Sequence, residues 1–141
     1  MDERFKGPPL EIKNKEAVEK VIRDFAYERG LIFTVHSPGL MWIVQRACVN
    51  TVFFRAVNIA AFRRDKDELL FFVPTVYRIK DWTSVIALDE KSFLCPLKFL
   101  YMLSADEMAG VIKVFLEAAW IGAELLNEDN PVQSLNTGKG D

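Results

Sequence analysis

The stretch 104–126, SADEMAGVIKVFLEAAWIGAELL, predicts one long helix, and this helix sets how the rest of the chain must pack. Ser104 can act as the N-cap, and Glu107 stands three residues later, where it completes a Ser-x-x-Glu capping box. Pro131 follows a polar run and cannot continue a helix. The expected helix therefore covers residues 105–126.

Apolar side chains surround this helix on almost every side. A count at 100° per residue places four charged side chains within about 40° of one another. A single sheet face covers only part of such a helix, so either other elements wrap it or a second copy of the chain covers what is left. The four charged side chains are Asp106, Lys113, Glu117 and Glu124.

Trp120 falls inside the charged stripe of the helix, one turn from Glu117 and one turn from Glu124. A tryptophan at such a position is expected to be partly exposed. One interpretation is that a loop or the tail of the chain lies over the ring. The other is that Trp120 contacts a partner, with Lys113, Glu117 and Glu124 beside it, because tryptophan is enriched at interface hot spots.

Upstream of this helix the sequence predicts a second amphipathic helix and then a series of strands. Apolar residues recur at helical spacing after Asn14, a plausible N-cap, and Gly30 stands where that helix should end. The expected strands cover 31–36, 40–46, 69–79 and 83–88, and Pro74 indicates an edge or a bulge in the third of them.

Two further segments lie among and after these strands. Residues 51–62 fit either a strand or a helix, and we favour the strand because a polar connection over 63–68 leads to the clearer strand after it. A short apolar helix is expected over 96–103.

The predicted fold class is α+β. An N-terminal helix precedes an antiparallel meander of about five strands, and a short helix and the long apolar C-terminal helix then pack on the sheet. Residues 1–13, with Gly7-Pro8-Pro9, are expected to form an extended arm that is loose or docks on a neighbour. Residues 14–130 would form a single domain, and the polar residues 131–141 a flexible tail.

Composition bounds the class of protein. The chain has 141 residues, of which 50% are hydrophobic, and this composition excludes disorder of the whole chain. The longest uncharged run, 31–45, is broken by Ser-Pro-Gly and is too short to span a bilayer, and the first residues lack the apolar core of a signal peptide. We therefore expect a cytoplasmic protein that does not enter a membrane.

Net charge is −2, but it is distributed unevenly along the chain. Residues 41–80 carry seven basic and three acidic side chains, a net charge of +4, whereas residues 81–141 carry four basic and ten acidic side chains, a net charge of −6. Opposite charges in the middle and at the end can attract each other within one molecule or between neighbours.

The sequence offers little for catalysis. His36 is the only histidine, and its neighbour Ser37 would point to the opposite face of a strand. Cys48 and Cys95 lie among apolar residues and are expected to be buried thiols. One histidine and two isolated cysteines give no metal-ligand spacing, so we predict no catalytic residue, metal or cofactor and favour a protein that is not an enzyme.

Arginine residues alternate with aromatic residues in the middle of the chain, a mixture typical of sheets that bind single-stranded nucleic acid. The overall pI near 5.5 is low for that role, so nucleic acid is the least favoured partner. An arginine at position 55 that points inward would need a charge partner or an anion. The candidate anion or nucleic-acid contacts are Arg55, Arg63, Arg64 and Arg78.

Two functional hypotheses remain. The leading one is a protein-interaction or assembly subunit that self-associates through the C-terminal helix. The alternative is a small apolar ligand held between the sheet and that helix. A void between them would favour ligand binding, whereas a dense core with an exposed apolar strip would favour assembly. The pocket candidates are Phe53, Phe71, Tyr77 and Phe115.

Overall fold

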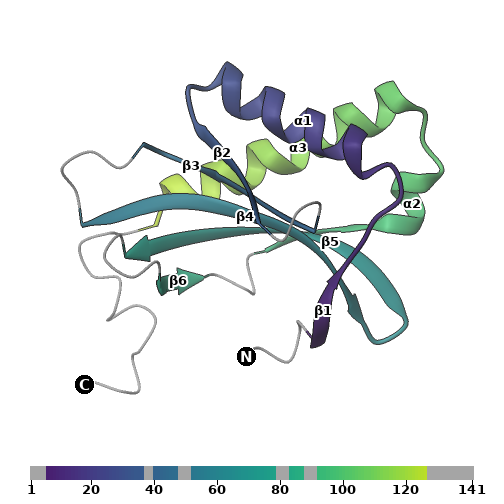
Figure 1. Cartoon of the computed structure of the whole chain (residues 1–141), viewed down its shortest axis with the longest axis horizontal. Coiled ribbons are helices and arrows are strands. Elements are labelled where there is room, and N and C mark those ends of the chain that lie inside the picture. Colours follow the sequence, from purple (N-terminus) through teal and green to yellow (C-terminus); the bar gives the residue numbers. More distant parts are fainter. Residues whose placement is uncertain (1–5, 37–39, 48–51, 79–82, 88–91, 127–141) are drawn as a thin grey trace.

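A computed structural model of the chain describes residues 6–36, 40–47, 52–78, 83–87 and 92–126 (Figure 1). It has an antiparallel seven-stranded sheet with helices packed on it, so the predicted α+β class is confirmed. In chain order the elements are β1 (Lys6–Leu10), α1 (Lys15–Glu28), β2 (Ile32–His36), β3 (Met41–Gln45), β4 (Phe53–Arg64), β5 (Asp67–Arg78), β6 (Thr83–Ala87), β7 (Phe93–Pro96), α2 (Leu97–Tyr101) and α3 (Ala105–Glu124).

The long hairpin of β4 and β5 forms the centre of the sheet. Its ladder runs from the pair Phe53–Arg78 to the pair Arg64–Asp67, so residues 53–62 form a strand as favoured from the sequence. The polar connection predicted over 63–68 is wrong, because both strands continue into it and leave a two-residue turn. Asp65 adopts φ 58° in this turn, a left-handed conformation that aspartate tolerates.

Different strands flank the two halves of this hairpin. The continuous order is β2-β3-β4-β5-β6, which is the predicted meander, while β1 also pairs with β4 and β7 also pairs with β5. The sequence did not predict β1 and β7 as strands. Residues 6–10 of the expected arm lie in the chain's own sheet, with Lys6 opposite Arg63 and Leu10 opposite Ala61.

Pro74 lies in the middle of β5, opposite Val57. The N–H of Arg46 donates to the carbonyl of Arg55. Because backbone hydrogen bonds alternate between the two sides of an antiparallel strand, this bond shows which residues of each strand bond to which neighbouring strand. By that alternation the ring nitrogen of Pro74 faces away from β4. On that outer side β7 begins opposite Phe72 and β6 ends opposite Thr75, so no described strand pairs with Pro74 there.

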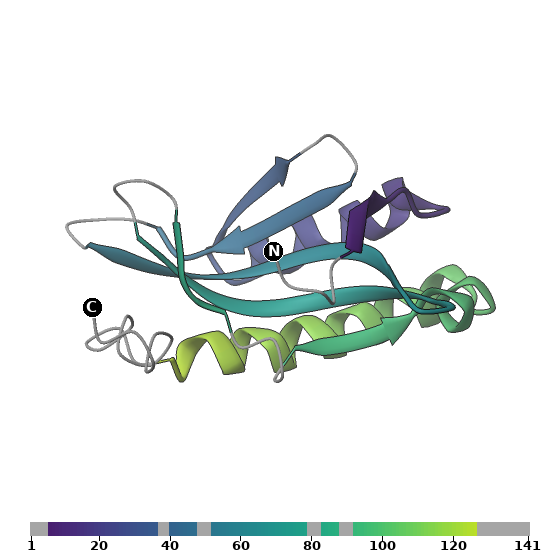
Figure 2. The ribbon, with the colours of Figure 1, turned by 90° about the horizontal axis from the view of Figure 1, so that it is seen from below.

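Helices cover one face of the hairpin, with α3 along β4 and β5 and with α1 against α3 and β3 (Figure 2). Buried side chains of all three helices and of β3, β4, β5 and β7 form the main core. The other face of the hairpin is also apolar and buried, with Phe54, Ala60, Phe62 and Phe71 among its side chains.

The helix ends follow the sequence signals with two differences, one being that α3 ends at Glu124, two residues before the predicted end. Ser104 and Glu107 form both bonds of the predicted capping box, with Glu107 N–H donating to Ser104 Oγ at 3.2 Å. Gly30 ends α1 in the left-handed region at φ 67°. Asn14 occupies the N-cap position of α1, but at φ 57° its side chain makes no cap bond, and its carbonyl accepts from Val18 N–H instead.

Candidate functional site

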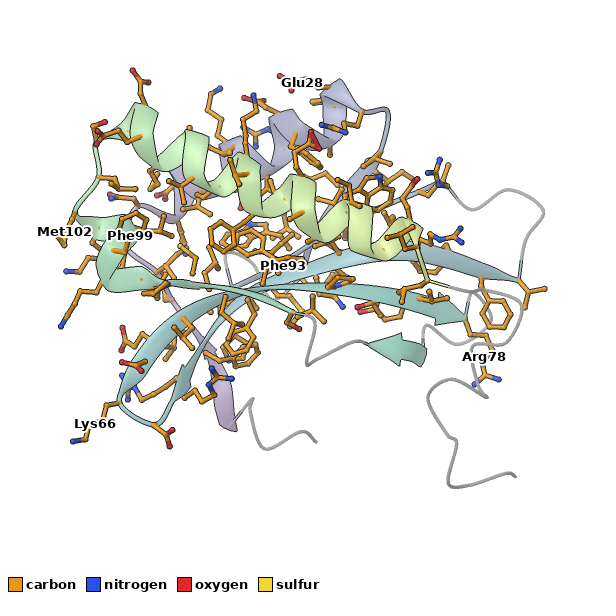
Figure 3. The ribbon with its side chains drawn as sticks, turned by 180° about the vertical axis from the view of Figure 1, so that it is seen from behind. Glu28, Lys66, Arg78, Phe93, Phe99 and Met102 are labelled. Atoms are coloured by element: carbon orange, nitrogen blue, oxygen red, sulfur yellow. The ribbon has the colours of Figure 1, made fainter. Side chains whose placement is uncertain are left out.

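The outer face of α3 is apolar. The sheet side of the helix buries Met108, Ile112, Leu116, Ala119 and Ala123. On the opposite side Val114, Ile121 and Leu125 are 66%, 58% and 79% exposed, and Ala118 lies between them half-buried. Figure 3 shows α3 as the outermost element on this side of the molecule. We call Val114, Ala118, Ile121 and Leu125 the α3 stripe.

The charged side of α3 faces α1 and the end of β3. Glu117 forms an ion pair with Arg29, and Glu124 forms one with Arg46. Lys113 Nζ lies 3.8 Å from Glu28 Oε1. All of these side chains are substantially exposed, so each pair contributes at most about 1 kcal/mol to stability. Their main consequence is positional, because they hold these charged side chains away from the outward side of α3 between Val114 and Leu125.

Trp120 lies beside these ion pairs and is only 6% exposed. The expectation of a partly exposed ring is therefore wrong. The guanidinium carbon of Arg46 lies 5.7 Å from the centre of the Trp120 ring, so an arginine that follows β3 covers it with a cation–π contact. An open groove of about 520 Å³ lies here, lined by Glu28, Arg29, Leu31, Arg46 and Trp120.

The four interface candidates thus lie together on one side of α3. The described contacts of Lys113, Glu117 and Glu124 join α3 to its own molecule. The apolar surface that lies exposed on α3 itself is the α3 stripe, which was not among the interface candidates predicted from the sequence. Its spacing of four, three and four residues was the available signal, but helical periodicity alone did not show which side the sheet would cover.

The pocket candidates divide between the two faces of the sheet. Phe115 packs against Phe72 on the helix side, with ring centroids 5.3 Å apart. Phe53 clusters with Val76 and Leu126 on that same side.

The other two pocket candidates, Phe71 and Tyr77, lie on the far face of the sheet. Tyr77 stacks on Phe54 at 5.4 Å, and Phe71 meets Phe62 edge to face. The four residues therefore do not line one cavity.

The contact between α3 and β5 is close at Gly122. A Cβ atom added there would lie 3.2 Å from the Cγ atom of Pro74. Phe93 of β7 is the next neighbour, and it lies beside α3 in Figure 3. The backbone of α3 therefore approaches the sheet so closely at Gly122 that a larger side chain would require Pro74 to shift by a few tenths of an ångström.

The four arginine candidates are spread along the hairpin. Arg63 pairs with Glu68 near the turn, and Arg64 lies one residue further on. Arg78 lies at the other end of the same hairpin, far from Lys66 at the turn (Figure 3). The four do not form one continuous basic surface.

Arg55 points to the helix side of the sheet and is half-buried. Its guanidinium donates to the carbonyl oxygen of Leu126 at 2.9 Å. A cation at the C-terminal end of a helix favours the helix dipole, so Arg55 holds the end of α3 on the sheet. Asn58 lies on the opposite face by the alternation of β4, so the two do not share a site.

Polar side chains on the far face bond to one another. Asn58 Nδ2 donates to Thr75 Oγ1 at 3.1 Å, and that hydroxyl donates to the Val73 carbonyl oxygen at 3.1 Å. Burial raises the pKa of the Tyr77 hydroxyl, and a hydrogen bond with Asn58 offsets part of that rise. This group supplies no nucleophile or base near neutral pH.

Cys95 is a free, buried thiol whose pKa is raised by burial to about 11. Cys48, Ser37, the far end of the predicted strand 69–79 and the expected tail 131–141 lie outside the described residues. Within the described segments no group of three or more His, Cys, Asp or Glu side chains could hold a metal ion. None of the helices described is both long and apolar enough to cross a membrane.

Large apolar side chains are exposed at a second place. Tyr27 of α1 is 78% exposed, and Ile32 of β2, which lines the same pocket, and Val35 of β2 are also exposed. Ile32 and Val35 lie in a strand as predicted, but their position at the edge of the sheet was not predicted. Strand order depends on contacts between distant residues, so no local signal indicated it.

Comparison of the chain with protein-family models, with curated proteins and with solved structures finds no match.

Proposed function

We propose that this protein is a non-enzymatic assembly subunit that forms a homodimer through the α3 stripe. The observation that supports the proposal is the exposure of Val114, Ile121 and Leu125 on one side of a rigid, well-capped helix. Apolar side chains exposed together at helical spacing are a feature of helix–helix interfaces. The cytoplasmic location stays a prediction.

The spacing of the stripe favours a second copy as the partner. Successive members are four, three and four residues apart, which is the spacing of a helix that packs along another helix. In a two-fold antiparallel pair centred on Ala118, that residue would lie beside its own copy. A small residue at the centre allows two helices to approach closely, and a two-fold contact uses the same patch on both molecules.

The ion pairs on the α1 side support the same proposal. They hold Lys113, Glu117 and Glu124 away from the centre of the stripe. Two copies can therefore meet without burying unpaired charge, which would cost several kcal/mol. Arg29 and Arg46 stay at the rim, where charge is tolerated.

The alternative function, binding of a small apolar ligand between sheet and helix, has weaker support. The four candidate residues lie on two faces of the sheet. Close contact of Gly122 with Pro74 leaves little separation between α3 and β5 there. A void between sheet and helix would favour ligand binding, whereas an exposed apolar strip on the helix favours assembly.

The test is the molecular mass in solution. Analytical ultracentrifugation at micromolar concentration is expected to give a dimer for the natural sequence and a monomer for Ile121→Glu, because a carboxylate at the centre of the stripe would be buried without a partner. The control is Tyr27→Glu, which places the same charge at an exposed apolar position on another helix and should leave the dimer intact.

A crosslink makes the geometry testable. With Cys48 replaced by serine, Ala118→Cys is expected to form an intermolecular disulfide on mild oxidation, and Lys66→Cys at the distant hairpin turn should not. A monomer at every concentration for the natural sequence would contradict the proposal. A dimer that survives Ile121→Glu and fails to crosslink at position 118 would place the interface elsewhere.

A further inference from the structure

The outer edge of β2 is open among the described residues. β2 lies at the end of the strand order and pairs with β3 alone. The Arg46–Arg55 bond shows that the even residues of β3 form their backbone hydrogen bonds with β4. The odd residues of β3 therefore bond to β2, and their partners there are Ile32, Thr34 and His36. The backbone N–H and C=O groups of Phe33 and Val35 therefore point outward along the free edge.

A pocket adjoins this open edge. It measures about 240 Å³ and lies between the outer side of α1 and the start of β2. Arg23, Ala26 and Tyr27 line it from the helix, and Leu31, Ile32 and Phe33 line it from the strand. Its walls are mainly apolar, with one guanidinium.

The size of the pocket indicates what it can hold. Small-molecule sites typically measure about 300 to 1,000 Å³, so this one is small for a metabolite. One bulky side chain fits such a space better than a whole ligand does. Its position next to unpaired backbone groups favours a side chain that arrives on an extended backbone.

The positive charge of the pocket lining indicates which chemical group the partner should carry. Arg23 is the one charged residue of the pocket lining, and its described ion pair is loose, with Nη1 3.8 Å from Glu19 Oε2. A carboxylate brought to the pocket would therefore gain a charge-assisted hydrogen bond. A second copy of β2 cannot supply it, because the strand reads Ile-Phe-Thr-Val-His.

We propose that an extended, acidic and apolar segment of another protein adds to β2 as an antiparallel strand. Its backbone bonds to Phe33 and Val35. The side chains opposite those two residues point toward α1, because paired residues share a face of the sheet. One of them is bulky and apolar and fills the pocket, and the other, two positions away, is acidic and meets Arg23.

This surface is separate from the α3 stripe. In Figure 2 β2 lies at one edge of the sheet, and α3 runs along the β5 side of the hairpin. A dimer formed through α3 would leave both β2 edges accessible. The peptide test can therefore use Ile121→Glu protein as well as the natural sequence, and failure of one proposal does not imply failure of the other.

The experiment begins with a phage-displayed library of random peptides of about 12 residues, selected on the whole protein. We expect enrichment of a bulky apolar residue with aspartate or glutamate two positions away. A synthetic peptide of the enriched sequence is then titrated by fluorescence anisotropy. Amide hydrogen exchange of the complex should show new protection at Phe33 and Val35, and not at Thr34, which already bonds to β3.

Two substitutions at one position separate backbone pairing from side-chain contact. Val35→Pro removes an outward N–H that no ladder bond uses and should weaken binding by at least about tenfold. Val35→Ala keeps the N–H and should stay within about threefold of the natural sequence. Circular dichroism checks that Val35→Pro protein is folded.

A charge swap gives a second route that does not depend on proline. Arg23→Glu should lose the acidic peptide and, in a repeated selection, enrich lysine or arginine at the same position. The proposal is overturned if no sequence is enriched, or if the enriched peptide binds Val35→Pro and Arg23→Glu proteins as tightly as the natural one. Enrichment without acidic residues would refute the role of Arg23, and β2-mediated self-pairing would appear as a dimer that Val35→Pro abolishes.

Discussion

At the scale of single residues, Trp120 has the neighbours on α3 that the sequence predicted, but its ring is buried where exposure was expected. The angular count placed it correctly between Glu117 and Glu124 on α3. The sequence could not indicate that Arg29 and Arg46 would come from α1 and from the end of β3 to pair with those acids. Once they do, Arg46 lies over the ring, and a tryptophan among charged residues becomes buried.

The buried thiol of Cys95 gives a prediction on pH. Its pKa in the folded protein is about 11, above the ordinary value of 9.0. Between these values the unfolded chain releases the proton and the folded chain keeps it, so the free energy of unfolding decreases as pH rises from 9 to 11. The loss should amount to roughly 1 to 3 kcal/mol and should be absent below pH 9.

Urea unfolding of the natural sequence and of Cys95→Ala at pH 8 and pH 10.5 measures this effect. The alanine variant is less stable at both values because it leaves a small cavity. Its further loss between the two pH values should be smaller than that of the natural sequence, because the variant lacks the Cys95 thiol. Equal losses would show that the Cys95 thiol titrates normally in the folded protein.

At the scale of elements, local signals predicted where segments begin and end, and distant contacts decided what they face. Ser104 and Glu107 fixed the start of α3 through bonds three residues apart. Pro74 indicated an interruption on one edge of β5, and that edge is the gap between β6 and β7. β1 and β7 were missed as strands, because their pairing with residues 61–63 and 69–72 has no local signature.

The two glycines of α3 give a prediction about packing. At Gly110 an added Cβ atom meets nothing within 4 Å, so Gly110→Ala should raise the free energy of unfolding by about 0.5 to 1 kcal/mol through helix propensity. At Gly122 the same atom would lie 3.2 Å from the ring of Pro74. Gly122→Ala should therefore show no gain, or a loss.

Urea denaturation of the two variants at one protein concentration checks this comparison. Each substitution is the same chemical change in the same helix, so the difference between them isolates the contact with Pro74. A gain at both positions would mean that α3 can move away from β5 without cost, and the close packing described between helix and sheet would then be wrong.

At the scale of the whole molecule, exposed apolar groups lie at two separate places. One is the α3 stripe, on the side of α3 that faces away from the sheet, and the other comprises Tyr27 of α1 with Ile32 and Val35 of β2. In Figure 2 β2 lies at one edge of the sheet, and α3 runs along the β5 side of the hairpin. If both proposals hold, the subunit pairs with its own copy through α3 and holds another protein at β2.

Association through α3 would also appear in stability. If the dimer forms only from folded chains, raising the protein concentration about 100-fold should stabilise it by roughly 2 to 3 kcal/mol per dimer, because unfolding separates two molecules. The thermal unfolding temperature of the natural sequence should therefore rise with concentration. Ile121→Glu should unfold at one temperature throughout the series, and Lys66→Glu, at the turn far from α3, should behave as the natural sequence does. Scanning calorimetry over that range gives the answer, and a temperature independent of concentration in the natural sequence would refute dimerisation in this range.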